Sequence, residues 1–122
     1  MTNTEQREKF LDIFAAFRKQ AKDEGIGFIV WTFYRSPADQ NYLYQQGRTR
    51  PGQKITNCDG FITLSNHQRW LAVDILIIED GAQIWERTPE YDRLGEIWTS
   101  LGGRWGGTFT SPDCYHFELL PD

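Results

Sequence analysis

The chain has 122 residues, which is enough for one domain with a modest hydrophobic core. Its formal net charge is -4, and it has no block of lysine and arginine of the kind that follows a phosphate backbone. The longest apolar stretch, Leu71–Ile78, is too short to cross a bilayer. We therefore expect a single soluble domain over residues 1–122 with neither nucleic acid nor a membrane as its partner. We also expect a monomer, although these features do not decide the oligomeric state.

The cysteines and the N-terminal residues indicate in which cellular compartment the protein is made. The only two cysteines, Cys58 and Cys114, lack the C-x-x-C spacing of a zinc knuckle or a redox motif. We expect them to be thiols in a reducing compartment, although a disulfide between them stays open. Residues 1–10 are polar and carry no apolar segment of a signal peptide, so we expect synthesis in a cytoplasm.

Three helices are predicted from apolar spacing and from the residues at their ends, over residues 5–24, 37–47 and 89–102. Thr2 and Glu5 have the spacing of a capping box before the first helix, and Gly25 supplies its end. Ser36 and Thr88 stand at the N-cap positions of the other two, each followed by a proline at the first helical position.

Strands are predicted over residues 28–34, 71–78, 104–109 and 115–120, and residues 48–64 form a long loop of the functional kind. Residues 71–78 are apolar on both strand faces, which predicts a central strand. Because helices and strands do not alternate regularly, the fold class is α+β, with a mostly antiparallel sheet flanked by helices.

Asp74 is the first candidate site residue, because it lies inside the apolar strand L-A-V-D-I-L-I-I. A buried carboxylate must be protonated, pair with a cation or bind a metal. The only two histidines are His67, just before this strand, and His116, in the last strand. If the strands are neighbours, two nitrogens and one oxygen meet and leave a fourth position free, as in a catalytic zinc site. Each of the three residues by itself is also compatible with a structural role.

Two further residues have the chemistry of catalysis. Asp113 lies three residues before His116, where a carboxylate can stand beside a metal and accept the proton of an attacking water. Arg35 directly follows an apolar strand, where a guanidinium can stabilise an oxyanion or hold a substrate carboxylate. A turn residue and an exposed strand-end arginine are the structural alternatives.

Several motifs, taken in order, resemble one family of zinc peptidases. They are Y-R-S-P-A-D-Q at 34–40, S-N-H-Q-R-W-L-A-V-D at 65–74, R-W-G-G-T-F at 104–109 and D-C-Y-H-F-E-L at 113–119. The family includes D-Ala-D-Ala carboxypeptidases, D-Ala-D-Ala dipeptidases and phage L-alanyl-D-glutamate endopeptidases (endolysins). It shares its fold with the hedgehog signalling domain, and the resemblance covers roughly residues 28–120.

The resemblance implies a role for each matching residue. His67, Asp74 and His116 would bind Zn²⁺, and Ser65 would line the substrate site. Asp113 would be the general base and Arg35 the group that stabilises the oxyanion. The D-x-x-H form resembles the endolysin branch, which implies cleavage of the L-Ala–D-Glu bond of peptidoglycan by an enzyme that waits in the cytoplasm of the host bacterium.

Two alternatives remain, a D-Ala-D-Ala carboxypeptidase and a non-catalytic zinc module that binds cell-wall peptide or a protein. They rest on two departures from the family's pattern. Trp70 stands where the family has glycine, and residues 58–64 lengthen the loop before Ser65. Either feature has the size to block the substrate groove.

Overall fold

The computed structural model describes all residues, 1–122, and begins with a long helix, α1 (Asn3–Asp23). Its N-terminus has the expected capping box, in which the Thr2 hydroxyl accepts from the Glu5 backbone N–H and the Glu5 carboxylate accepts from the Thr2 N–H. Phe10, Phe17 and Ala21 are fully buried on one face. The predicted first helix is therefore confirmed, with its start two residues earlier.

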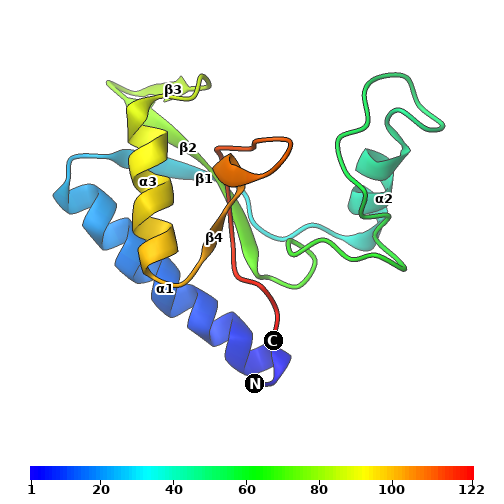
Figure 1. Ribbon diagram of the computed structural model, residues 1–122, viewed down its shortest axis with the longest axis horizontal. Coiled ribbons are helices and arrows are strands. Elements are labelled where there is room, and N and C mark those ends of the chain that lie inside the picture. Colours follow the sequence, from blue (N-terminus) through cyan, green and yellow to red (C-terminus); the bar gives the residue numbers. More distant parts are fainter.

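An antiparallel sheet follows, in the strand order β1-β2-β5-β4, with β3 also paired to β2. Its strands are β1 (Gly27–Thr32), β2 (Ala72–Glu79), β3 (Ala82–Ile84), β4 (Arg104–Trp105) and β5 (His116–Glu118). β2 has β1 on one side and both β5 and β3 on the other, so it is the central strand that its apolar faces predicted. The α+β class and the antiparallel pairing are confirmed (Figure 1).

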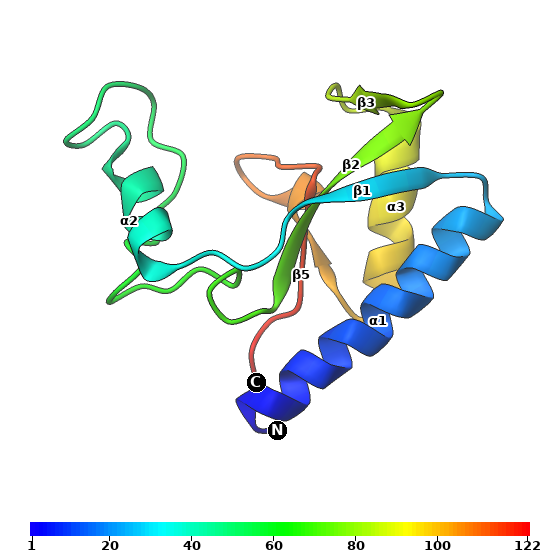
Figure 2. The same cartoon turned by 180° about the vertical axis from the view of Figure 1, so that it is seen from behind.

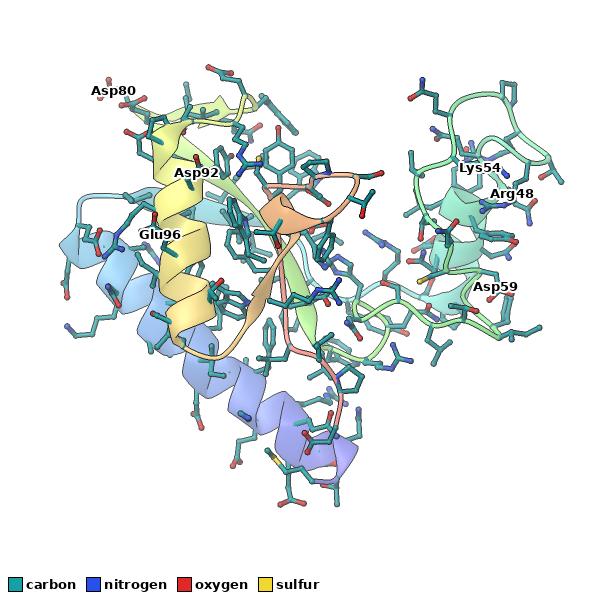
Figure 3. All side chains as sticks on the ribbon, viewed as in Figure 1. Arg48, Lys54, Asp59, Asp80, Asp92 and Glu96 are labelled. Atoms are coloured by element: carbon teal, nitrogen blue, oxygen red, sulfur yellow. The ribbon has the colours of Figure 1, made fainter.

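The hydrophobic core lies between one face of this sheet and the two helices α1 and α3 (Pro89–Ser100). Val73, Ile75 and Ile77 of β2 reach it from the sheet, where alternation puts every second side chain on the same face. Seen from behind, β1 and β2 lie in front of α3, so the opposite face of these strands carries no helix (Figure 2). The charged residues Asp92 and Glu96 lie on the outside of α3 (Figure 3).

The short helix α2 (Pro37–Gln45) and the loop 48–64 project from the other end of β1 (Figures 1 and 3). The Ser36 hydroxyl caps α2 by accepting from the Asp39 N–H at 3.1 Å, as predicted. Thr88 occupies the N-cap position of α3 but makes no side-chain cap bond, so that part of the prediction is wrong. The loop is free of helix and strand apart from one isolated bridge between Gln46 and Arg50.

Three strand predictions need correction. Strand β3 was missed, because only three residues follow the tight turn at Asp80 (φ 51°) and Gly81 (φ 78°). The strand expected over 104–109 stops at Trp105 and becomes a 3₁₀ turn over Gly106–Thr108. β5 is shorter than residues 115–120, although Tyr115 and Leu119 still make one cross-strand backbone bond each.

The structure also gives the state of the cysteines and the membrane-spanning potential of the helices. Both cysteines are free thiols, so no disulfide links Cys58 to Cys114. None of the helices combines the length and the apolar character needed to span a bilayer.

Candidate active site

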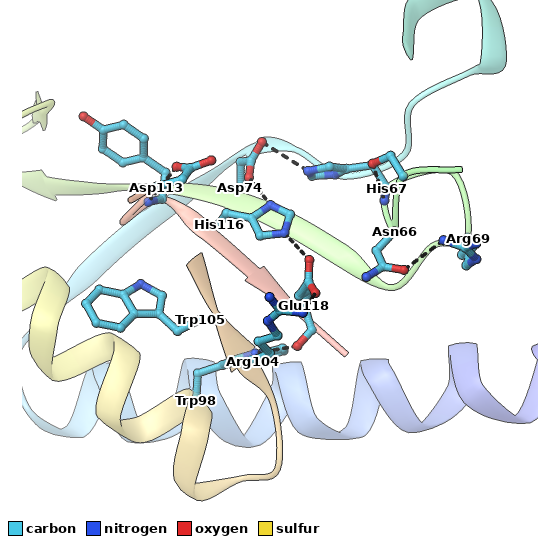
Figure 4. A network of polar contacts seen from close by, with 12 residues as sticks. Asn66, His67, Arg69, Asp74, Trp98, Arg104, Trp105, Asp113, His116 and Glu118 are labelled. Atoms are coloured by element: carbon cyan, nitrogen blue, oxygen red, sulfur yellow. Dashed lines mark hydrogen bonds and ion pairs between the residues drawn. The ribbon is translucent and has the colours of Figure 1, made fainter. Parts of the chain in front are cut away.

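The antiparallel register of β2 and β5 brings the candidate ligands together. Asp74 and His116 are direct partners across the two strands, and His67 ends the loop that leads into β2. One ligand atom from each of the three residues lies within 4.8 Å of the other two. The Asp74 carboxylate stands between the rings, with Oδ1 3.1 Å from His116 Nδ1 and Oδ2 3.3 Å from His67 Nε2 (Figure 4).

The outer nitrogen of each imidazole is held by an acceptor on the protein. His67 Nδ1 lies 2.8 Å from the Phe33 carbonyl oxygen, and His116 Nε2 lies 2.5 Å from Glu118 Oε1. Because both acceptors take a proton, each outer nitrogen is a donor, and a metal that displaces any proton shared with Asp74 would meet the lone pairs of the inner nitrogens. The donor set of two nitrogens and one oxygen, with fixed tautomers, therefore fits a divalent cation such as zinc.

The charges of the cluster are strongly coupled. Burial alone would raise the pKa of Asp74, but hydrogen bonds from His116 and His67 outweigh it and hold the pKa well below its usual range. Burial alone would lower the pKa of His116, but the Asp74 and Glu118 carboxylates raise it to about 9. Without a metal, the site thus holds a proton where a cation would bind.

Arg35 approaches the cluster from the segment between β1 and α2. Its Nη2 lies 3.8 Å from Asp74 Oδ2, and its Nη1 donates to Gln40 Oε1 at 2.9 Å. The Gln40 side chain is 1% exposed and donates in turn to the Cys58 carbonyl oxygen at 3.0 Å and toward the Thr56 hydroxyl at 3.3 Å. The guanidinium is therefore oriented by a neutral, buried amide rather than exposed at a strand end.

Asp113 is placed by the turn that follows β4. Its backbone N–H donates to the Gly106 carbonyl oxygen at 2.9 Å, and a side chain on Gly106 would meet the Asp113 carbonyl oxygen at 2.4 Å. Only glycine permits this approach. The carboxyl faces the same cavity as Asp74 and His116, and loss of hydration, followed by the Asp74 charge, raises the pKa of Asp113 (Figure 4).

All six residues predicted for the site line one cavity of about 470 Å³. Ser65 lies at its wall, and its hydroxyl accepts from the His67 N–H at 3.1 Å, so it also shapes the turn that carries this ligand. The loop 48–64 contributes to the wall through Ile55, Thr56 and Cys58. Of the inserted residues 58–64, Cys58 and Leu64 line the cavity.

Trp70 does not line the cavity. Its ring stacks on Tyr34 at 4.4 Å, and the Arg7 guanidinium covers it at 4.7 Å. Its φ of 62° lies in the left-handed region, which glycine adopts without strain and which explains a glycine at this position of the family pattern. Trp70 thus replaces glycine in a left-handed backbone conformation, and its ring packs on Tyr34 outside the cavity lining.

Two site residues were not singled out from the sequence. Glu118 shares a strand face with His116, so the alternation of β5 gave a signal for it. Gln40 gave none beyond its place in the motif, because only the fold brings α2 against the loop at Thr56 and Cys58.

Comparisons with known proteins show what the chain is similar to. A family model described as D-alanyl-D-alanine carboxypeptidase matches residues 60–119. The chain is 33% identical over 117 residues to the peptidoglycan L-alanyl-D-glutamate endopeptidase CwlK of Bacillus subtilis (strain 168), covering 88% of this chain and 69% of that protein.

Two solved structures share the fold. The L-Ala D-Glu endopeptidase ChiX of Serratia marcescens superposes with a TM-score of 0.57 at 24% identity, over 78% of this chain and 68% of that one. A variant of the vancomycin resistance D,D-pentapeptidase VanY, in complex with Zn(II), gives a TM-score of 0.64 at 18% identity, over 92% and 71%.

Proposed function

Because the chain belongs to the D-alanyl-D-alanine carboxypeptidase family of peptidases, we propose that it is a zinc-dependent peptidoglycan peptidase that cleaves the L-Ala–D-Glu bond of stem peptides. The observation that carries the proposal is the convergence of His67, Asp74 and His116, with ligand atoms within 4.8 Å of one another. The similarity to CwlK, an L-alanyl-D-glutamate endopeptidase, supports the choice of bond.

His67, Asp74 and His116 would hold the zinc ion, two through nitrogen and one through oxygen. A bound zinc would polarise the scissile carbonyl and the water that attacks it. Glu118 and the Phe33 carbonyl oxygen keep the two rings in the orientation and tautomer that this requires.

Asp113 would be the general base. A raised pKa brings its carboxylate closer to the basicity needed to accept a proton from the attacking water and to pass it to the leaving amine. The carboxyl lines the cavity, forms no ion pair, and accepts a hydrogen bond from the Tyr115 backbone N–H at 3.3 Å.

Arg35 would stabilise the negative charge that develops on the carbonyl oxygen, and Ser65 would contact the substrate at the cavity wall. Gln40, which accepts the hydrogen bond of Arg35, is neutral, so Asp74 at 3.8 Å is the one ion-pair partner of the guanidinium. A module that only binds cell-wall peptide has no need of such a base and oxyanion-stabilising pair.

The proposed setting is that of a phage or prophage endolysin, a monomer made in the host cytoplasm that reaches peptidoglycan after release. The D-x-x-H form at Asp113–His116 supports this branch. Added protein should lower the turbidity of permeabilised bacteria and leave intact cells unaffected.

The test is mass spectrometry of the products released from purified peptidoglycan by the native protein and by Asp113→Ala. Asp12→Ala, which removes an exposed carboxylate from α1, is the matched control. New N-terminal D-Glu with the native and Asp12→Ala proteins, and none with Asp113→Ala, supports the proposal. Release of free D-Ala would make the protein a carboxypeptidase. If zinc-loaded native protein releases no product, the protein is instead a non-catalytic module that binds cell-wall peptide.

A further inference from the structure

Two tryptophans stand exposed beside the candidate active site without contributing to its cavity. Trp31 of β1 is 57% exposed, and Trp85, just after β3, is 49% exposed. Their ring centroids lie 5.3 Å apart with the planes at 85°, so each presents an indole surface to solvent. Exposed apolar groups gathered in this way mark binding surfaces more often than isolated ones do.

The strand register places Trp85 on the sheet face that carries Asp74. Ile84 pairs with Ile77, whose side chain belongs to the core face. The next residue, Trp85, therefore falls beside Leu76 on the opposite face, and Leu76 shares that face with Asp74 two residues away. This is the face that no helix covers in Figure 2.

A bulge places Trp31 close to the same point. The pairing of β1 with β2 shifts between Val30 and Thr32, and Thr32 is the partner of Asp74. Bulges re-aim the side chain of the extra residue, and here that residue is Trp31. On the other side, Trp85 contacts Tyr115 at 6.2 Å between ring centroids, and Tyr115 directly precedes the ligand His116.

We propose that Trp31 and Trp85 form a sugar-binding platform that takes the glycan strand to which the stem peptide is attached. The proposal rests on the proposed function. In peptidoglycan the first L-Ala is joined to the lactyl group of an amino sugar, so one lactyl group and one alanine separate the sugar from the scissile bond, about two residue lengths or roughly 7 Å. A sugar-binding surface is then expected within a few residues of the zinc ligands, and the strand register places Trp31 next to Thr32, the cross-strand partner of Asp74.

The chemistry of the platform fits a carbohydrate. A pyranose ring offers C–H groups on its faces, which pack on indole rings, and hydroxyls at its rim, which stay in water. Tryptophan supplies a large rigid contact area that combines an apolar body with one polar N–H. The perpendicular pair offers two such surfaces, enough to hold more than one sugar unit.

The experiment compares hydrolysis of two substrates that differ only in the sugar: the free stem peptide and the same peptide on its disaccharide. Trp31→Ala and Trp85→Ala should lower kcat/KM for the disaccharide substrate by about tenfold, through KM, and leave the free peptide unaffected. Phe61→Ala, which removes another exposed aromatic (65%) from the loop, is the matched control. Equal losses on both substrates, or no loss on either, would overturn the proposal.

A binding measurement separates this proposal from the proposed function. The tetramer of N-acetylglucosamine is titrated into the native, Asp113→Ala and Trp85→Ala proteins while indole fluorescence is followed. The first two should bind alike and Trp85→Ala at least tenfold more weakly, even if the native protein cleaves neither substrate. If instead Trp31→Ala only converts a dimer to a monomer in sedimentation, the surface binds a second copy and the sugar proposal fails.

Discussion

The Gln40 amide is the most informative side chain to change, because it connects Arg35 to the loop wall of the cavity. We consider Gln40→Glu, which keeps the length and an oxygen acceptor for Arg35. The change replaces the donor Nε2, which lies 3.0 Å from the Cys58 carbonyl oxygen, by a second oxygen. It also sets a negative charge beside Arg35, in a position that is 1% exposed.

Two effects of different size follow. The new ion pair with Arg35 offsets only part of the broken hydrogen bonds to Cys58 and Thr56 and of the desolvation of a buried carboxylate, since each of these is of the order of 1–3 kcal/mol. The free energy of unfolding should therefore fall by about 1–3 kcal/mol. Removal of one oxyanion-stabilising donor costs about 100-fold or more in kcat. Partial neutralisation of Arg35 should cost at least about tenfold.

The assay is kcat and KM for stem-peptide hydrolysis, with bound zinc and the urea midpoint measured on the same samples. Gln83→Glu, which adds the same charge on the exposed strand β3, is the control and should behave as the native protein. A Gln40→Glu variant with full kcat, in a protein where Arg35→Ala is inactive, would refute the idea that a neutral partner keeps the Arg35 charge available.

Three further outcomes are expected. Glu118→Gln should bind zinc about 10–100-fold more weakly in a competition titration with a chelator, because His116 loses its charged acceptor; unchanged affinity would deny Glu118 that role. In the metal-free protein the pKa of His116 is raised to about 9, so its contribution to stability is complete below about pH 6.5 and is lost as the pH rises through 9. Urea midpoints that stay level or rise over that range would contradict this assignment. Trp70→Gly should relieve about 1 kcal/mol of left-handed backbone strain but lose the stacking on Tyr34, for a net destabilisation of about 1–3 kcal/mol by thermal unfolding. A more stable variant would mean that strain dominates.

The elements with local signals were predictable from the sequence. The Thr2–Glu5 capping box and the Ser36 cap appear in the structure as expected, because each depends on contacts within three residues. Strand lengths were less predictable. The chain after Trp105 turns at Gly106 because the Asp113 backbone packs against that glycine. Asp113 belongs to the next turn of the chain, so the pattern of residues 104–109 alone gives no sign of this contact.

For the candidate site, the sequence by itself determined which chemistry was available: two histidines in the whole chain, one aspartate in an apolar strand, and a second aspartate three residues before His116. Residue types and their order are enough for that, because metal ligands and general bases come from a short list of side chains. Only the tertiary structure decided that Asp74 and His116 are cross-strand partners, that Gln40 orients Arg35, and that Trp70 packs away from the cavity. These are contacts between segments distant in sequence, and their geometry depends on strand register and backbone conformation, which no local pattern fixes.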